Sequence, residues 1–386
     1  MDADEGPRVL MIGWEFPPLV SGGLGVACAG LVRGLTALGC RITLLVPGQG
    51  GEGRHPVAPA PDVEGLRILR VPMGLQPYPS SDGLYGPDLM RNVDRLAERS
   101  VSLAGDDAFD VIHAHDWMTY PAAAALRLRL RRPSIAHVHA TEFARSGPRA
   151  DPAIEGIERR GILGADRVIC VSRRTSEVVR RRYGISPTRL RVVHNAVDAG
   201  DEQADIGFPN DRPLVLYVGR LTRQKAPAVF LEAARAVLEL RPDVEFVLAG
   251  TGDRMEWLRA RMLELGIADR VSLPGFLPPE RLEDLYRRAS VYAMPSIDEP
   301  FGLTVLEAAR HHVPAIVSSG AGAIEVVPSV LRVEPGDAEA LARRIVFLLD
   351  SPVSGWLLAR HAAEEVAQRS WRRAAAECMA VYSEVS

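Results

Sequence analysis

The sequence predicts two α/β domains, each built on a doubly wound parallel sheet with helices on both faces. Short apolar runs alternate with longer amphipathic segments in both halves of the chain, and this βαβ rhythm is typical of parallel sheets. This alternation is interrupted once, by a polar segment rich in Gly and Pro at residues 198–213, and then resumes. The chain of 386 residues is also longer than one ordinary domain requires.

The first half predicts a domain over residues 1–200. Its apolar runs end in polar residues, as strands do at the edge of a sheet that binds ligands, and Gly39 ends a helix over 24–39. A second clear helix covers 173–183. The expected strands are 8–14, 41–47, 110–117, 133–141, 165–172 and 190–198.

The second half repeats the pattern and predicts a domain over residues 211–365. We expect helices at 227–240, 254–265, 279–289, 303–311, 338–350 and 354–386, and strands at 214–220, 244–252, 270–276, 291–296 and 314–319. The last helices outnumber the strands that they can cover, so one of them is expected to pack elsewhere. Two such domains joined by a hinge at 198–213 face each other across a cleft, at the carboxyl ends of their strands, where such folds bind ligands.

Composition excludes several classes of protein. Hydrophobic residues make up 47% and charged residues 25%, which matches a globular chain, and the net charge of −3 argues against a nucleic-acid binder. The acidic N-terminus is no signal peptide, and no apolar stretch has the length of a membrane span. The Arg-rich segments 126–132 and 180–182 are expected to be solvated helix faces, so any membrane contact is peripheral.

The cysteines indicate a reducing compartment. They are few, none forms a C-x-x-C pair, and buried thiols of a cytoplasmic protein explain them better than disulfides or a zinc site. They are Cys28, Cys40, Cys170 and Cys378.

A glycine-rich loop at residues 21–25 follows the first strand and opens a helix. The backbone amides at Gly22 and Gly23 can approach a phosphate or another anion there. A Walker A loop is excluded because no lysine lies nearby, and a dinucleotide site is disfavoured because the second strand runs into Pro47-Gly48-Gln49 instead of an acid. A purely structural glycine turn remains an alternative.

The segment 296–312 carries the strongest pattern. Pro300 and Gly302 stop a strand just before a helix, so the amides of Gly302, Leu303 and Thr304 are expected to point at an anion. Glu299 precedes this turn and Glu307 lies one turn inside the helix, where carboxylates can accept hydrogen bonds from hydroxyls.

Two cations are available to compensate these carboxylates. Arg220 closes a strand and Lys225, the one lysine among 46 basic residues, follows five positions later. The compact ammonium group of Lys suits a phosphate, whereas the planar guanidinium group of Arg prefers to donate two parallel hydrogen bonds. The pattern therefore predicts a diphosphate site, with two capping acids and two surface cations as the alternative.

Together these motifs resemble the retaining GT-B glycosyltransferases of glycosyltransferase family 4, and among them the bacterial and archaeal glycogen (starch) synthases. The resemblance covers nearly the whole chain. It is carried by Glu299-x7-Glu307, Gly219-Arg220 with Lys225, Gly250-Thr251-Gly252, WEFPPLVSGGLG (14–25), HAHDW (113–117) and HNAVD (194–198).

The resemblance implies roles for individual residues. Arg220 and Lys225 would hold the donor diphosphate, Glu307 the ribose, Glu299 the hydroxyls of the transferred sugar, and His139 would lie beside the reacting sugar. Further donor contacts are expected from Gly22, Gly23, Gly250, Gly252, Phe301, Gly302, Leu303 and Thr304. Acceptor-side contacts are expected from Glu15, Asp116 and Trp117, with a core position as the alternative for Trp117. The final helix, 366–386, would pack back on the first domain.

The implied activity is retaining transfer of a sugar, with glucose as the best guess, from a nucleotide diphosphate sugar to an acceptor hydroxyl. The acceptor would be an α-glucan or another saccharide, and no metal or other cofactor is expected. A nucleotide-sugar epimerase, a glycan phosphorylase and a non-catalytic nucleotide-sugar-binding protein are alternatives. The chain departs from the glycogen synthases at Val20-Ser21, where they carry a lysine before Gly-Gly, and at Ala226, where they have glycine. The oligomeric state is left open.

Paired histidines suggest a competing interpretation. His113 and His115, and likewise His137 and His139, alternate along a strand, so both members of each pair share a face. Such pairs can bind a metal, with Asp116 adding a carboxylate. Metal hydrolases of this kind need further ligands from later strands, which the second half does not offer, so we expect no metal site and a structural role for His137.

Overall fold

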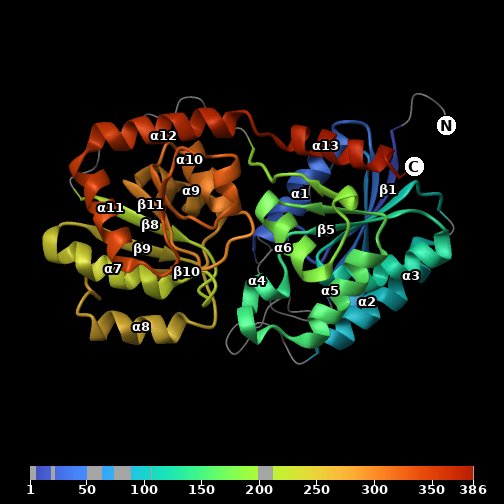
Figure 1. The fold of residues 1–386 in the computed structure, drawn as a ribbon, viewed down its shortest axis with the longest axis horizontal. Coiled ribbons are helices and arrows are strands. Elements are labelled where there is room, and N and C mark those ends of the chain that lie inside the picture. Colours follow the sequence, from blue (N-terminus) through green and yellow to red (C-terminus); the bar gives the residue numbers. More distant parts are fainter. Residues whose placement is uncertain are drawn as a thin grey trace. The chain divides into compact units, whose positions relative to one another are not determined.

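The structure is a computed structural model of the chain, and it describes residues 6–18, 22–49, 63–73, 88–105, 107–198 and 212–385. The chain forms two compact units. Unit 1 contains the first part of the chain up to Ala196 together with Ser370–Ser386, and unit 2 contains Val197–Arg369. In each unit, helices cover both faces of a parallel sheet (Figure 1).

Seven parallel strands form the sheet of unit 1, in the order β3-β2-β1-β4-β5-β6-β7. The central strands β1, β4 and β5 are buried almost throughout, because helices cover both of their faces. The strand order reverses between β1 and β4, and a doubly wound sheet binds its ligands beyond the carboxyl ends of the strands at such a point. The strands are β1 (Arg8–Ile12), β2 (Arg41–Gln49), β3 (Leu66–Met73), β4 (Val111–His115), β5 (Ser134–Val138), β6 (Arg167–Cys170) and β7 (Leu190–Val192).

The helices of unit 1 include the last helix of the chain. α13 packs on α1, where two glycines make room for the Trp371 side chain and backbone. A Cβ atom at Gly30 would lie 2.1 Å from the Trp371 ring, and one at Gly34 would lie 2.3 Å from the Trp371 carbonyl oxygen. The helices are α1 (Gly23–Thr36), α2 (Leu89–Ala104), α3 (Tyr120–Leu130), α4 (Glu142–Ser146), α5 (Pro152–Gly164), α6 (Arg173–Tyr183) and α13 (Trp371–Ser383).

Unit 2 repeats the architecture with six parallel strands in the order β10-β9-β8-β11-β12-β13. Here the order reverses between β8 and β11. The strands are β8 (Leu214–Val218), β9 (Glu245–Ala249), β10 (Val271–Gly275), β11 (Val291–Met294), β12 (Ala315–Ser318) and β13 (Leu331–Val333). The helices are α7 (Pro227–Leu240), α8 (Met255–Glu264), α9 (Pro279–Arg288), α10 (Leu303–Arg310), α11 (Ala338–Asp350) and α12 (Pro352–Ala367).

The structure confirms the two doubly wound sheets and corrects several elements. The expected helix 354–386 is wrong: it is two helices, α12 and α13, because the Ser370 hydroxyl caps a new helix by accepting a hydrogen bond from the Arg373 amide (3.2 Å). The expected strand 110–117 ends at His115. Strands β3 and β13 and helix α2 were not expected. Most of the expected hinge, residues 199–211, lies outside the described residues.

Other expectations concern membrane contact and thiols. Within the described part of the chain, no helix has both the length and the apolar character that crossing a membrane requires. All four cysteines are buried free thiols. In the Arg-rich segment of α6, Arg180 and Arg181 pair with Glu177, and Arg182 pairs with Glu155, as expected for a solvated helix face.

Candidate active site

The loop between β11 and α10 in unit 2 presents the start of a helix. Gly302 immediately precedes α10 with a φ angle of 105°, and a Cβ atom there would lie 3.2 Å from Met294 Cε. Glycine is therefore the residue that this turn requires. The first amides of a helix, here those of Leu303 and Thr304, have no partner within the helix and favour an anion.

Glu299 and Lys225 form an ion pair beside this helix start. The Lys225 Nζ atom lies 2.5 Å from Glu299 Oε2, and the two side chains are 20% and 6% exposed. The Ser296 hydroxyl donates to the same carboxylate oxygen (3.2 Å). The backbone of Glu299 is held too, because its carbonyl accepts from the Gly322 amide (3.0 Å). The single lysine of the chain is thus fixed next to a nearly buried carboxylate.

A buried tyrosine fixes the loop that carries the two cations. Tyr217, on β8, is 1% exposed, and its hydroxyl lies 3.1 Å from the Arg220 carbonyl oxygen and 3.3 Å from that of Lys225. Ala226, which precedes α7, has a φ angle of 51°. This left-handed conformation explains why glycine suits the position, since an alanine there has an unfavourable Cβ contact.

The glycines of the Gly-x-Gly turn bring two loops into backbone contact. A Cβ atom at Gly250 would lie 1.9 Å from the Gly219 carbonyl oxygen, and one at Gly252 would lie 2.4 Å from that of Leu221. The amide of Leu221 donates to the Thr251 carbonyl (2.8 Å). These glycines therefore place the loop after β8 directly against the loop after β9, whatever else they contact.

Glu307 on α10 is held by a second tyrosine. The Tyr286 hydroxyl donates to Glu307 Oε2 (2.9 Å), and the Tyr292 hydroxyl lies 2.6 Å from Thr304 Oγ1 one turn earlier. Burial raises the pKa of Glu307, and the hydrogen bond from Tyr286 and the charge of Arg310 oppose this effect. The two tyrosines thereby set the orientation of α10 and of its carboxylate.

In unit 1, four histidines gather at the carboxyl ends of β4 and β5. His113 Nε2 lies 3.1 Å from His137 Nδ1, and His115 Nδ1 lies 2.9 Å from His139 Nε2. The two pairs stack on each other, with ring centroids 4.5 Å apart on the β4 side and 4.4 Å apart on the β5 side. The Tyr382 hydroxyl of α13 bonds to His113 Nδ1 (2.7 Å).

These imidazoles are neutral at pH 7. Burial lowers the pKa of all four rings, and it lowers that of His139 to about 3 with the help of the Arg145 charge. A neutral imidazole has one donor and one acceptor nitrogen, so each ring offers hydrogen bonds rather than a positive charge.

Asp116 holds the backbone that follows β5. Its Oδ1 atom accepts hydrogen bonds from the amides of His139 (2.7 Å) and Ala140 (3.2 Å), and its Oδ2 atom pairs with Arg145 (3.0 Å). The side chains of this ion pair are 2% and 4% exposed. Its carboxylate is thus engaged within unit 1, where it holds the backbone after β5, and the expected acceptor contact stays a prediction.

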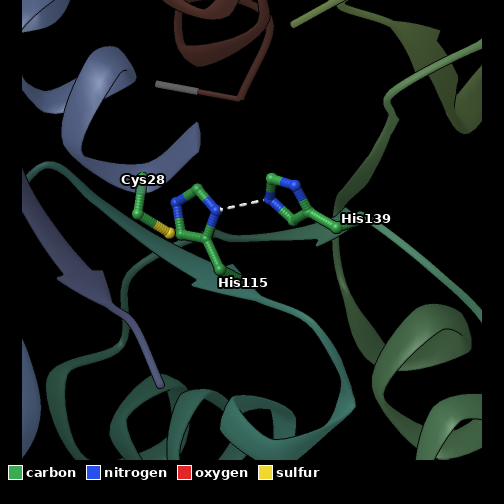
Figure 2. Close-up of side chains that lie close together, drawn as sticks. All are labelled: Cys28, His115 and His139. Carbon is green, nitrogen blue, oxygen red and sulfur yellow. Dashed lines mark hydrogen bonds between the residues drawn. The ribbon is translucent and has the colours of Figure 1, made fainter. Parts of the chain in front are cut away.

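Among the residues that the structure describes, two groups of side chains have the composition of a metal site. The possible ligand atoms of Cys28, His115 and His139 lie within 4.8 Å of one another, as do those of His113, His115 and His137. Figure 2 shows the His115 ring between Cys28 and the His139 ring. Burial raises the pKa of the Cys28 thiol, with Asp116 and Glu15 adding to the effect. Thiol and imidazole ligands suit zinc, but here the ring nitrogens face each other in hydrogen-bonded pairs.

Two family models match the chain in succession. The Glycosyltransferase Family 4 model matches residues 21–201, and the Glycosyl transferases group 1 model matches residues 198–369. This chain belongs to the GT-B glycosyltransferases of family 4. The two matches together span both units apart from the chain ends.

Two relatives and one solved structure match this glycosyltransferase over nearly its whole length. An uncharacterized glycosyltransferase of Methanocaldococcus jannaschii is 28% identical over 97% of each chain. The glycogen synthase of Mycobacterium tuberculosis is 27% identical over 97% of this chain and 94% of its own. The structure of sucrose-phosphate synthase from Thermosynechococcus elongatus matches with a TM-score of 0.80 at 23% identity, covering 98% of this chain and 99% of that one, which supports the fold.

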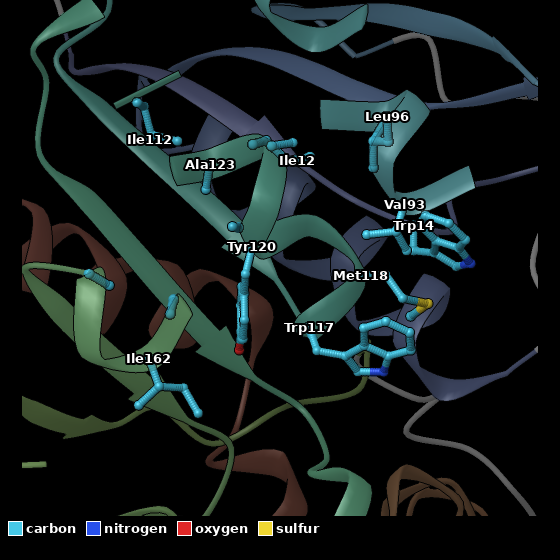
Figure 3. Packing of buried hydrophobic residues seen from close by; sticks show 14 of the residues in the cluster. Ile12, Trp14, Val93, Leu96, Ile112, Trp117, Met118, Tyr120, Ala123 and Ile162 are labelled. Carbon is cyan, nitrogen blue, oxygen red and sulfur yellow. The ribbon is translucent and has the colours of Figure 1, made fainter. Parts of the chain in front are cut away.

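The glycosyltransferase does not use Trp117 as a stacking surface. Asp116 has a φ angle of 62°, which turns the chain after β4 and directs Trp117 into the core of unit 1. Figure 3 shows Trp117 among core side chains, and it has no exposed surface. The alternative of a core tryptophan is therefore correct. Glu15 also is buried, at 2% exposure.

The remaining predicted residues lie at the start of α1 and in the loop after β11. Gly22 precedes α1 with open space around the position of a Cβ atom, and Gly23 begins the helix. Val20 and Ser21, where the chain departs from the glycogen synthases, lie outside the described residues. Phe301 is buried, and its carbonyl accepts from the Ala323 amide (2.7 Å).

Sequence reasoning missed the residues whose hydrogen bonds and ion pairs support the predicted site residues. Tyr217, Tyr286 and Arg145 each fix a predicted site residue or its backbone, and none of them has a motif that marks it. His115 was noted only as a possible metal ligand, whereas the structure pairs it with His139. The available sequence signal for this pairing was that His115, directly before Asp116, and His139 lie at the ends of two successive expected strands.

Proposed function

We propose that this glycosyltransferase transfers a hexosyl group, with glucose as the best candidate, from a nucleotide diphosphate sugar to a saccharide hydroxyl with retention of the anomeric configuration. The observation that carries the proposal is the Lys225–Glu299 pair beside the start of α10. The name of the glycogen synthase relative supports glucose as the sugar and an α-glucan as the acceptor.

The proposed chemistry needs positive charge and no metal. The bond between the anomeric carbon and the diphosphate oxygen breaks, and its electron pair leaves with the diphosphate. The acceptor oxygen forms the new bond on the same face of the sugar, and its proton passes to an oxygen of the leaving diphosphate. Arg220, Lys225 and the first amides of α10 would stabilise the leaving group, as preorganised donors do in other enzymes.

The ion pair suggests how unit 2 receives its donor. On arrival of the diphosphate, Lys225 would exchange its Glu299 partner for a phosphate oxygen. The carboxylate released by this exchange would then accept hydrogen bonds from the hydroxyls of the transferred sugar. Lys225 would have an ionic partner in both states, and Glu299 would exchange its ionic partner for hydrogen bonds, so neither charged group would be left without a partner.

The test is an assay of UDP-, ADP- and GDP-glucose with and without maltooligosaccharides, with the product anomer read by NMR. We expect an α-linked product from at least one donor. Nucleotide diphosphate release without an acceptor product would favour an epimerase, and an absolute requirement for phosphate would favour a phosphorylase. Binding of a nucleotide sugar without turnover would identify a non-catalytic protein and refute the proposal.

A further inference from the structure

The contact between His115 and His139 is a hydrogen bond between two ring edges. The Nδ1 atom of His115 and the Nε2 atom of His139 are 2.9 Å apart, while the ring centroids are 5.1 Å apart. This combination means that the two nitrogens face each other, as Figure 2 shows. One of the two must donate, because two neutral rings that both presented lone pairs would repel.

The ring nitrogens that do not take part in this bond, His115 Nε2 and His139 Nδ1, have different surroundings. His115 Nε2 is buried and has no hydrogen-bond partner among the residues that the structure describes. His139 is half-buried, and within the described ranges its Nδ1 atom makes no hydrogen bond. Cys28 lies beside the His115 ring in Figure 2, but no hydrogen bond joins the thiol to His115 Nε2.

These surroundings decide which ring donates. A proton on His115 Nε2 would be a buried N–H group without an acceptor, and such groups are rarer and more costly in proteins than unpaired acceptors. His115 therefore carries its proton on Nδ1 and donates to His139 Nε2. Because His139 is neutral, its own proton must then lie on Nδ1.

We infer that His115 is a positioning residue that fixes the tautomer of His139, so that His139 presents its Nδ1–H group as a hydrogen-bond donor. This excludes His139 as a general base in the free protein, since its acceptor nitrogen is occupied. The ligand that fits is an oxygen acceptor, either a sugar hydroxyl or a phosphate oxygen. The assignment of that oxygen to the donor substrate rests on the function proposed above.

The neighbouring histidine pair provides a matched control. His113 and His137 lie one layer away and also meet through two nitrogens, at 3.1 Å, but His113 uses Nε2 for this contact and Nδ1 for Tyr382. A substitution at His113 thus perturbs the same cluster, by a similar volume, without touching the bond to His139.

The first experiment reads the tautomer directly in the free protein. In long-range ¹H–¹⁵N spectra of ¹⁵N-histidine-labelled protein, protonated and unprotonated ring nitrogens have well-separated shifts. The chain has nine histidines, and His139→Asn identifies the signals of His139 by their loss. We expect a protonated Nδ1 and an unprotonated Nε2. Protonation at Nε2, or signals of a metal-bound ring, would overturn the inference, whether or not transferase activity is found.

The second experiment uses the shape of amide side chains. The Asn amide nitrogen can occupy the place of His Nδ1, and that of Gln the place of Nε2. His115→Phe should lower kcat about tenfold, with the donor KM changed less than threefold, and it should give His139 a mixture of tautomers. His115→Asn should restore much of the kcat and of the single tautomer of His139, whereas His115→Gln should not. The kcat of His113→Asn should stay within about twofold of wild type. Rescue by Gln alone, or an unchanged tautomer in His115→Phe, would refute the role of His115.

Discussion

Replacing Lys225 by alanine tests the diphosphate site more directly than any other change. The substitution removes the ammonium group that lies 2.5 Å from Glu299. We expect kcat/KM for the donor to fall by ~100-fold or more, which corresponds to ~2.7 kcal/mol of lost transition-state stabilisation. A charge that contacts the leaving group in a partly desolvated site has an effect of this size.

The same substitution should also lower stability, because it leaves a carboxylate behind. Glu299 is 6% exposed, and among the described residues it would keep only the Ser296 hydroxyl as a side-chain partner. Breaking a fully buried pair costs ~3–5 kcal/mol, and water reaching the space left by the 20%-exposed Lys225 should reduce this to about 2 kcal/mol. A calorimetric Tm lower by about 4–8 °C is the expected result for a unit of this size.

Two further variants separate stability from catalysis. Adding Glu299→Gln to Lys225→Ala removes the unpaired charge, so it should recover most of the lost Tm and none of the lost activity. Arg223→Ala removes an exposed cation two residues away on the same loop and should leave kcat/KM within about twofold. Turnover like that of wild type in Lys225→Ala, or an equal loss in Arg223→Ala, would show that the diphosphate assignment is wrong.

Three other outcomes can be checked independently. Transfer should continue in excess EDTA, and loss of activity that a divalent ion restores would make the histidine groups metal ligands. Ala226→Gly should raise the free energy of unfolding by up to about 1 kcal/mol, measured by urea titration, because Ala226 has a φ angle of 51°. Burial raises the pKa of Glu158 from 4.5 to about 7, so its ionisation disfavours the folded state. Stability should therefore fall by about 3 kcal/mol from pH 4.5 to pH 8, and Glu158→Gln should flatten this part of the profile.

The limits of some elements could be predicted because one residue sets them. The expected helices 227–240 and 303–311 match α7 and α10 closely. Pro227 suits the first position of a helix, and Gly302 adopts a conformation that no helix continues through. The end of α12 was missed because neither Gly nor Pro stands between it and Ser370. A serine cap inside an amphipathic pattern gives a much weaker signal.

The acids and cations of the candidate donor site could be chosen from the sequence, and the groups that hold them could not. Arg220, Lys225 and Glu299 are charged residues that closely follow apolar strands, and Glu307 lies on the helix after Glu299, at positions where a charge has few structural explanations. Tyr217 and Tyr286 lie within or next to ordinary apolar patterns, and their hydroxyl partners are known only once the fold brings them together. Long-range hydrogen bonds of this kind correspond to no recognisable motif or residue spacing in the sequence.

The charges of the two units also argue against a metal among the histidines. In unit 1 the imidazoles are neutral, and the Asp116 carboxylate is already balanced by Arg145 at 3.0 Å. A divalent ion bound to His115 and His139 would add positive charge next to the buried Arg145, which already lowers the pKa of His139. A metal bound through the two nitrogens that face each other would also break the bond between the rings, because the proton that one ring donates to the other would have to leave. The positive charge for a leaving diphosphate is therefore expected from Lys225 and Arg220 in unit 2, whereas the neutral rings of unit 1 can offer only hydrogen bonds.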